Sequence, residues 1–237
     1  MADSTPVNPT AADPAAAWRG PRRRRDHGTK RDAVIRTAAR AFDERGYHNT
    51  SLDDIAAALG VTKPTIYYYV ANKEQLLFEC FLAGLEPIRA ALRRAEQTPG
   101  SGRDRLREVI HDYAVAIASE YGWCMVRAEH QDLGPELGAE VRSLKSEIDR
   151  GIRRLLQAGI NDGSISVTDP KLAAFAIAGA LNWIAHWYRA GRTLTSSEVA
   201  DAFVQFLEHG LAPRKPAAGN PVRAPGRGRR TRVVAKA

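Results

Sequence analysis

The 237-residue chain lacks the features that mark several large classes of protein. Its two cysteines, Cys80 and Cys124, are too few for a disulfide framework or a cysteine-rich metal site. No uninterrupted apolar run approaches the roughly 18 residues that a membrane-spanning helix needs. The first residues contain no apolar segment of the kind found in secretory signals. We therefore expect a cytoplasmic protein that does not associate with a membrane.

Sequence patterns of common catalytic and nucleotide-binding sites are also missing. The chain contains no HExxH, GxSxG, Walker or GxGxxG pattern, and its six histidines are scattered. His111 and His130 each lie near an acidic residue, which fits surface helix positions better than metal ligands. We therefore expect no enzyme activity, no metal site and no cofactor.

The formal net charge of +8 is concentrated at the two ends of the chain. Residues 1–28 carry five arginines against three aspartates, and residues 212–237 carry eight basic residues and no acid. The remaining 183 residues hold 22 basic and 24 acidic side chains, so the body is almost neutral. Both ends are rich in proline and alanine or glycine, and we predict a disordered basic arm (1–28) and a disordered basic tail (212–237). A solvated tail and a phosphate-contacting arm are both open readings of these arginine clusters.

Apolar residues between the two ends recur at helical spacing, and we find no alternating strands and no internal repeat. The predicted fold class is all-α. Capping residues, glycines and prolines divide the chain into nine predicted helices, over about residues 29–46, 51–59, 62–70, 72–97, 103–121, 123–131, 135–160, 169–190 and 196–210.

Two of these helices are joined by a very short turn, which is the pattern of a helix-turn-helix unit. Ser51–Leu59 is followed by Gly60-Val61, and Thr62 then caps a second short helix. Gly60 lies where the chain needs a positive φ angle. The exposed side of the second helix offers hydroxyl groups, a cation and apolar groups that can meet base edges, thymine methyls and phosphates: Thr62, Lys63, Pro64, Thr65 and Tyr68.

The segment around this unit resembles a known family. Glu44-Arg45-Gly46-Tyr47, followed by TSLDDIAAALGVTKPTIYYYVANKEQLL, closely resembles the DNA-binding region of TetR-type bacterial transcriptional regulators. The resemblance covers about residues 29–77. Pro64 and Val70 depart from the family pattern, which often has glycine and phenylalanine there. The resemblance implies a DNA-binding domain (29–77) followed by a regulatory domain (78–211) that holds a ligand pocket and a dimer interface.

The resemblance also assigns roles to individual residues. It places Tyr67 against a DNA phosphate and Tyr68 against the DNA backbone or base edges, while Tyr69 packs towards the body or the fourth helix. Support of the three-helix core is the alternative for each tyrosine. Thr50, Ser51 and Lys73 complete an expected phosphate clamp, because helix N-termini direct free N–H groups at anions. For Ser51, helix capping is an equal alternative.

The second half fits the regulatory plan implied by the resemblance. Residues 170–191 are apolar on nearly every side, and with 196–210 they supply the expected homodimer interface over about 169–211. The segment NWIAHWYRAGRTLT also loosely resembles regulators of fatty-acid, steroid or acyl-CoA catabolism. We expect an apolar effector cavity lined by some of Phe81, Tyr113, Ile117, Tyr121, Trp123, Asn182 and Trp183, with ordinary core packing as the alternative.

The sequence thus predicts a regulator that binds a palindromic operator in double-stranded DNA. The resemblance favours a repressor released by a small apolar or acyl-CoA-type effector. The alternative is an architectural protein that binds DNA nonspecifically through its basic tails. A helical-bundle enzyme is a further rival, but no catalytic constellation supports it.

Overall fold

The computed structural model describes residues 14–18, 26–128 and 132–209. Within these ranges every regular element is a helix, in agreement with the predicted fold class. None of the described helices is both long and apolar enough to span a lipid bilayer. The elements are η1 (Pro14–Trp18), α1 (Asp26–Arg45), α2 (Leu52–Leu59), α3 (Lys63–Tyr67), α4 (Lys73–Gln97), α5 (Gly102–Ile117), α6 (Gly122–Val126), α7 (Pro135–Asn161), α8 (Pro170–Asn182), α9 (Ile184–Trp187) and α10 (Ser196–His209).

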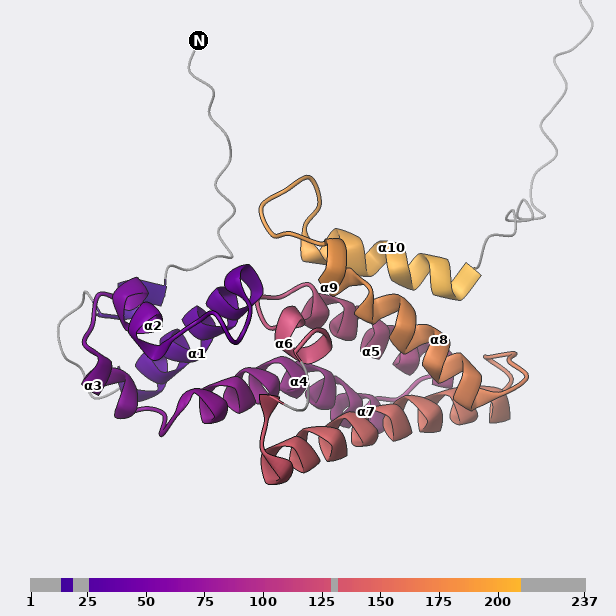
Figure 1. Ribbon diagram of the computed structural model, residues 1–237. Helices are drawn as coiled ribbons and strands as arrows, with labels where there is room; N and C mark the ends of the chain where they lie inside the picture. The colour runs from indigo at the N-terminus through magenta and orange to yellow at the C-terminus, as the bar shows by residue number, and fades with distance from the viewer. Residues whose placement is uncertain (1–13, 19–25, 129–131, 210–237) are drawn as a thin grey trace, which may run out of the picture.

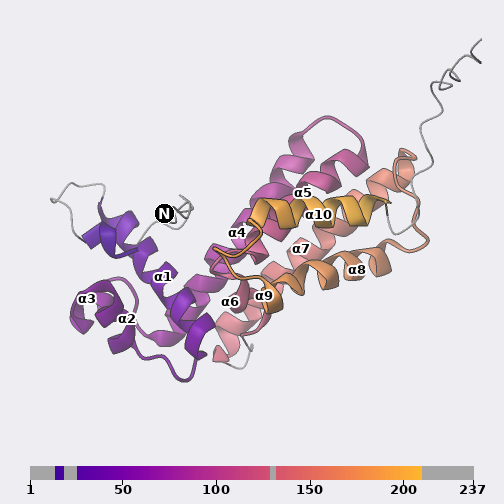
Figure 2. The ribbon, with the colours of Figure 1, turned by 90° about the horizontal axis from the view of Figure 1, so that it is seen from above.

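Helices α1, α2 and α3 form one end of the molecule, and the later helices form a bundle at the other end (Figures 1 and 2). Helix α4 starts beside the first group and runs into the bundle, where it packs against α5 and α7. Helix α10 packs along α5, and α8 packs on both α5 and α7. Helix α4 is therefore shared by the two ends.

Two hydrophobic cores correspond to these two ends. The first joins α1, α2 and α3 to the start of α4, and includes the fully buried Phe42, Ile66 and Phe81. The second lies within the bundle and takes Leu85 and Ile88 from the later part of α4. The change of core between Phe81 and Leu85 means that one continuous helix is packed into both groups.

Polar side chains set the starting points of several helices. Asn72, Ser101 and Asp169 precede α4, α5 and α8, and each accepts a hydrogen bond from a backbone N–H group in the first helical turn. Such caps satisfy donors that have no partner within the helix. Pro135 and Pro170 occupy the first positions of α7 and α8, where a missing N–H group carries no penalty.

Some predicted boundaries differ from the structure. The helix predicted over 103–121 ends at Ile117, because the chain turns so tightly that a Cβ atom on Gly122 would lie 2.0 Å from the Ile117 carbonyl oxygen. The helix predicted over 169–190 is divided at Trp183 into α8 and α9. Of the helix predicted over 123–131, the structure describes α6, and residues 129–131 lie outside the described ranges.

Helices α5 and α7 approach each other closely through two glycines. A Cβ atom on Gly102 would lie 2.2 Å from the backbone nitrogen of Gly159, which real contacts do not allow. Near this contact the Asp162 carboxylate accepts a hydrogen bond of 2.6 Å from the Gly102 N–H group. The start of α5 is thereby held directly against the end of α7.

The basic arm predicted over 1–28 contains described structure. Residues 14–18 form the one-turn helix η1, and α1 begins at Asp26 rather than near Thr29. Trp18 packs against the first core, where its ring lies roughly perpendicular to that of Tyr69 with centroids 5.9 Å apart. The rest of the arm and the tail over 212–237 lie outside the described residues.

Candidate nucleic-acid interface and internal cavity

Local hydrogen bonds fix both ends of α2. The Ser51 Oγ accepts a hydrogen bond of 3.1 Å from the Asp54 N–H, and the Asp54 carboxylate accepts one of 2.7 Å from the Ser51 N–H. These two bonds form a reciprocal capping box. Hydrogen bonds to the Asp54 carboxylate, first from the Ser51 hydroxyl and then from the Ser51 N–H, hold the pKa of Asp54 below its usual value. Gly60 ends the helix with φ of 67°, as predicted, in a region that residues with a side chain rarely adopt. The turn that leads into α3 is therefore determined by residues within it.

Helix α3 is oriented by one apolar anchor. Ile66 is fully buried against the first core, while Tyr68 is 70% exposed and Tyr67 is 49% exposed. Thr65 is half-buried, and its hydroxyl lies 3.0 Å from that of Thr62. The outer surface of this helix and its caps presents Thr62, Lys63, Pro64, Tyr67 and Tyr68.

The three consecutive tyrosines point in different directions. Tyr69 is half-buried, and its ring contacts Trp18 and also the edge of Tyr68, with 5.1 Å between the Tyr68 and Tyr69 centroids. Tyr69 thus packs into the first core, whereas Tyr67 and Tyr68 face outward. The side chains of Tyr67 and Tyr68 accordingly lie on the outer surface at the end of α3.

A concave patch of about 400 Å³ lies beside α3, between the N-terminal ends of α2 and α4. We call it the helix-turn-helix patch. The Lys73 side chain crosses the Tyr47 ring, with Nζ 4.2 Å from the ring centroid. Burial lowers the pKa of Lys73, and the nearby Asp132 carboxylate opposes this effect. The patch is lined by His48, Asn49, Thr50, Ser51, Leu52, Lys63, Tyr67, Asn72 and Lys73.

The residues predicted to contact DNA phosphates differ in how exposed they are and in the hydrogen bonds that they make. Thr50 is 1% exposed, and its hydroxyl is 3.1 Å from the Ala41 carbonyl oxygen and 2.9 Å from that of Gly46. Its side chain therefore holds the loop between α1 and α2 to α1, instead of facing outward as a clamp would require. Ser51 is exposed but caps α2. Lys63 donates a 2.7 Å hydrogen bond to the Asp53 carboxylate, which raises the pKa of Lys63.

A contact that the sequence did not reveal joins this patch to the start of α7. The Asp132 side chain, with 9% of its surface exposed, lies 2.8 Å from Nε2 of His48. Two residues further on, the Gly134 N–H donates a hydrogen bond of 2.7 Å to the Glu74 carboxylate on α4. No sequence pattern signals this contact, because His48 and Asp132 are 84 positions apart in the chain.

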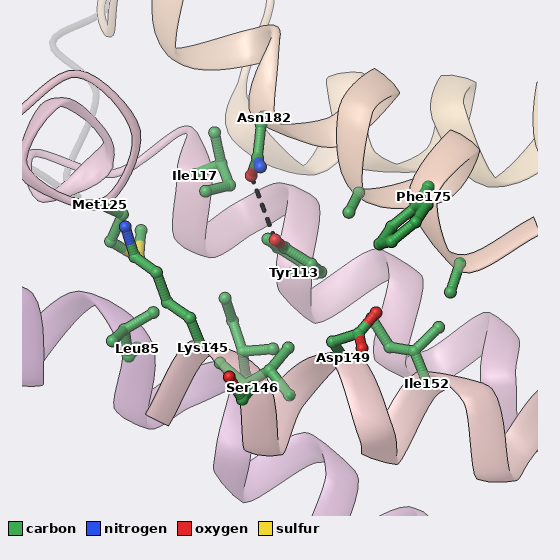
Figure 3. Close-up of a pocket in the computed structure, with 14 residues that line it drawn as sticks. Leu85, Tyr113, Ile117, Met125, Lys145, Ser146, Asp149, Ile152, Phe175 and Asn182 are labelled. Atoms are coloured by element: carbon green, nitrogen blue, oxygen red, sulfur yellow. Dashed lines mark hydrogen bonds between the residues drawn. The ribbon is translucent and has the colours of Figure 1, made fainter. Parts of the chain in front are cut away.

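The bundle contains a cavity of about 350 Å³, which we call the bundle cavity (Figure 3). Tyr113 and Asn182 meet on its wall, where the Tyr113 hydroxyl donates a 3.1 Å hydrogen bond to Asn182 Oδ1. Burial raises the pKa of Tyr113 to about 12, so this phenol is neutral at physiological pH. The cavity is lined by Leu85, Ile88, Tyr113, Ile117, Met125, Lys145, Ser146, Ile148, Asp149, Ile152, Ala174, Phe175, Ala178 and Asn182.

Three predicted effector residues, Tyr113, Ile117 and Asn182, line the bundle cavity. Trp123 lines a second cavity of about 430 Å³ at the junction between α1 and the bundle. Trp183 is 62% exposed and stacks on His186, so its side chain faces away from the interior and not into the cavity as predicted.

The two remaining predicted residues line neither cavity. Phe81 is fully buried in the first core, and Tyr121 is half-buried between the two cores. Burial raises the pKa of Tyr121 to about 12. Lys145 and Asp149 also line the bundle cavity, and the sequence did not reveal them, because helical spacing does not show which side of α7 meets α5. Among the described residues, no group of three or more His, Cys, Asp or Glu side chains could hold a metal ion.

Comparison with known proteins agrees with this geometry. Residues 34–80 match the family described as bacterial regulatory proteins of the tetR family, and residues 99–211 match a tetracyclin repressor-like C-terminal domain. The HTH-type transcriptional repressor KstR2 of Rhodococcus jostii is 28% identical over 189 residues, which cover 77% of this chain and 91% of KstR2. The HTH-type transcriptional activator FasR of Mycolicibacterium smegmatis is 23% identical over 82% of this chain and 87% of FasR.

Solved structures give the same result. The TetR-family regulator PfmR of Thermus thermophilus superposes with a TM-score of 0.68 at 28% identity, over 76% of this chain and 99% of PfmR. AibR, solved with isovaleryl coenzyme A and operator DNA, has a TM-score of 0.64 at 29% identity, over 74% of this chain and 96% of AibR. This chain belongs to the TetR family and is a DNA-binding transcriptional regulator.

Proposed function

We propose that this regulator binds a palindromic operator as a homodimer, represses transcription there, and is released when an effector occupies the bundle cavity. We further propose that residues 29–77 form the DNA-binding domain and residues 78–211 the regulatory domain. The named relatives include both a repressor and an activator, and AibR was solved with both an acyl coenzyme A and operator DNA. The observation that carries the proposal is the course of α4.

Helix α4 connects the helix-turn-helix patch to the bundle cavity. Lys73 lies in the patch, and Leu85 and Ile88, further along the same helix, line the cavity. At 1.5 Å per residue, Lys73 and Leu85 are about 18 Å apart along the helix axis. A ligand that displaces the cavity end of α4 would therefore change the position of the DNA-binding end. The ligand drives this change by binding the DNA-incompetent state more tightly than the competent one.

The proposed DNA contacts can be tested once operator sites have been selected from random DNA. Tyr68→Ala and Thr65→Ala should each weaken operator binding by about 1–3 kcal/mol if these side chains contact bases or the adjacent backbone. Lys73→Ala should weaken all DNA sequences alike and flatten the salt dependence. Arg142→Gln, at an exposed position of α7, is the control. Unchanged footprints for all three variants, with folding intact, would remove α3 as the reader.

The dimer proposal relies on an exposed apolar stripe along α8. Leu172, Phe175 and Trp183 are exposed at spacings of three and eight residues, which place them on one side of a helix. Phe206 on α10 is exposed as well. A two-fold axis through these helices would cover the stripe and present two α3 helices to half-sites about one DNA turn apart.

Sedimentation of a lysine variant tests this interface. Phe175→Lys should convert a micromolar dimer into a folded monomer, because each copy would place an ammonium group in the apolar contact. Val167→Lys, at an exposed apolar position in the loop before α8, should leave the dimer intact. A wild-type monomer at micromolar concentration would refute the proposal.

Effector release has a reciprocal test. A coupling of about 1–3 kcal/mol would lower operator affinity roughly 5- to 150-fold, and operator DNA must weaken ligand binding by the same factor. A ligand of the bundle cavity that binds equally with and without operator would exclude release by this route. Neutral substitution of Arg22, Arg23, Arg24 and Arg25, combined with removal of residues 212–237, separates this proposal from nonspecific binding through the tails. It leaves Trp18 and the start of α1 in place, and operator preference should survive it.

A further inference from the structure

We propose that Asp53 determines the DNA specificity of this regulator, by holding Lys63 for a guanine base and by weakening the attraction of Lys63 for DNA phosphates. This inference rests on the proposed function, in which α3 reads an operator. It adds a residue of α2 to the reader and predicts a guanine that each half-site must contain.

The two side chains form an ion pair between the helices of the helix-turn-helix unit. Lys63 is the first residue of α3, and Asp53 is in the first turn of α2. The Lys63 Nζ atom donates a hydrogen bond of 2.7 Å to Asp53 Oδ2. Helices α2 and α3 pack side by side (Figures 1 and 2), so this bond spans the turn that joins them.

The pair lies on the surface from which α3 would contact DNA. The Lys63 side chain is 43% exposed and that of Asp53 is 63% exposed. Lys63 and Tyr67 both line the helix-turn-helix patch, and Tyr68 is exposed at the end of the same helix. A major groove that receives α3 would therefore meet Lys63 with the Asp53 carboxylate bound to it.

Stability gives little reason for this ion pair. Exposed ion pairs contribute little to folding, because water screens the charges and the side chains lose freedom. The start of α2 is already fixed by the capping box of Ser51 and Asp54, and its end by the positive φ of Gly60. The contact between Asp53 and Lys63 is therefore better explained by binding than by folding.

An acid at a DNA-contacting surface changes what the adjacent lysine can bind. Duplex DNA carries about one negative charge per 1.7 Å of its axis, and lysines attract it without regard to sequence. The Asp53 carboxylate offsets the charge of Lys63 and is itself repelled by phosphates. A phosphate contact at this position is therefore weak, and binding to nonspecific DNA is reduced.

The same bond prepares Lys63 to read a base. An ammonium group has three donors, so the bond to Asp53 leaves two for acceptors in the major groove. The bond also raises the pKa of Lys63, which keeps all three protons in place at physiological pH. A lysine that is already held loses less side-chain freedom on binding than a mobile one.

Guanine is the base that fits this donor set. Its major-groove edge presents two neighbouring acceptors, N7 and O6, and lysine or arginine at these atoms is the commonest specific contact. Adenine presents N7 beside an N6–H₂ donor, which would face the ammonium group donor to donor. The pair thus discriminates G·C from A·T, whereas a lysine at a phosphate would discriminate nothing.

Site selection from random duplex DNA, followed by fluorescence anisotropy at several salt concentrations, tests the inference. The wild-type half-site should contain one G·C pair that depends on Lys63, and its replacement by A·T should lower affinity on the order of ten-fold. Lys63→Gln should move the preference at this pair to adenine, because a glutamine amide pairs with adenine N6 and N7.

Asp53→Asn keeps the shape of the side chain and removes its charge. The guanine preference of this variant should fall to about three-fold or less, since its ammonium group can turn to phosphates. Its affinity for a mixed-sequence duplex at low salt should rise by about three-fold, with a steeper salt dependence. Glu140→Gln, which removes one negative charge at an exposed position of α7, is the control and should change neither quantity.

The failures of the two proposals can be told apart. If Asp53→Asn keeps the wild-type guanine preference, or if its affinity for mixed DNA rises no more than that of Glu140→Gln, Asp53 does not determine specificity, and a defined wild-type operator would leave the proposed function standing. If Lys63→Gln retains the guanine, the assignment of this base to Lys63 is wrong, and this variant decides even where Asp53→Asn fails to fold. Selection that yields no preferred site for the wild type would refute both proposals.

Discussion

Replacing Lys145 by methionine is expected to stabilise the ligand-free protein, because the substitution removes a half-buried, partly desolvated charge from the cavity wall. Burial lowers the pKa of Lys145 from 10.5 to about 8. Methionine is apolar and flexible enough to follow a similar path along the wall. The size of the effect follows from the difference between the two pKa values.

A change of one in pKa corresponds to about 1.4 kcal/mol. The fall from 10.5 to about 8 therefore makes the ammonium group about 3 kcal/mol less favourable in the folded than in the unfolded protein at pH 7. The contact with the Phe81 ring, 5.1 Å from Nζ, offsets about 1 kcal/mol of this. Lys145→Met should raise the free energy of unfolding by about 2 kcal/mol at pH 7.

The effect has a defined pH dependence. Because the folded-state pKa lies below the unfolded one, the unfolded chain binds more protons between pH values of about 8 and 10.5, and the stability of the wild type rises with pH in this window. The advantage of Lys145→Met should consequently shrink to less than about 1 kcal/mol by pH 10.

Urea denaturation followed by circular dichroism, at pH 7 and pH 10, measures both quantities. Arg142→Gln, an exposed substitution on the same helix, should change the free energy of unfolding by no more than about 0.5 kcal/mol at either pH. A Lys145→Met protein less stable than wild type at pH 7, or an advantage that is the same at pH 10, would refute the reasoning.

Three further predictions concern particular contacts. Gly102→Ala should destabilise the protein by more than about 2 kcal/mol in thermal unfolding, because the added Cβ atom would collide with the Gly159 backbone. Gly28→Ala is the control: its Cβ atom would have no neighbour within 4 Å, so this variant should be neutral or slightly stabilising. Cys80 and Cys124 are both buried, and burial raises the pKa of Cys80 well above its usual value. Both thiols should therefore react with a thiol reagent at pH 8 only as fast as the protein opens. Immediate labelling of the native protein would contradict this prediction. Asp132→Asn removes a negative charge that acts on both Lys73 and Tyr47. Operator affinity at low salt should therefore rise by about three-fold, and the pKa of Tyr47 should fall in an ultraviolet titration. Weaker operator binding would show instead that the contact of Asp132 with His48 positions the patch.

The local structure of the helix-turn-helix unit was predictable from the sequence. The cap at Ser51, the positive φ at Gly60 and the inward side chain of Ile66 depend on interactions within a few residues, and the structure agrees with all three. The all-α class was predictable for the same reason, because apolar spacing is a property of each helix by itself.

The surroundings of individual side chains depended on contacts between distant parts of the chain. Thr50 was expected to face DNA, but its hydroxyl binds carbonyl groups at the end of α1, while His48 pairs with Asp132 across the junction between the two ends. Trp183 was expected inside, but it lies on the exposed side of the bundle.

The residues that line the bundle cavity also divide into those that the sequence suggested and those that only the tertiary structure revealed. The sequence alone determined that aromatic and amide side chains such as Tyr113 and Asn182 were available for a pocket, since their residue types can be read directly. The tertiary structure decided that Lys145 joins them, because only the packing of α7 against α4 and α5 sets which of its side chains faces the cavity. Helical periodicity defines the sides of a helix, and the neighbours that meet each side are chosen by the fold.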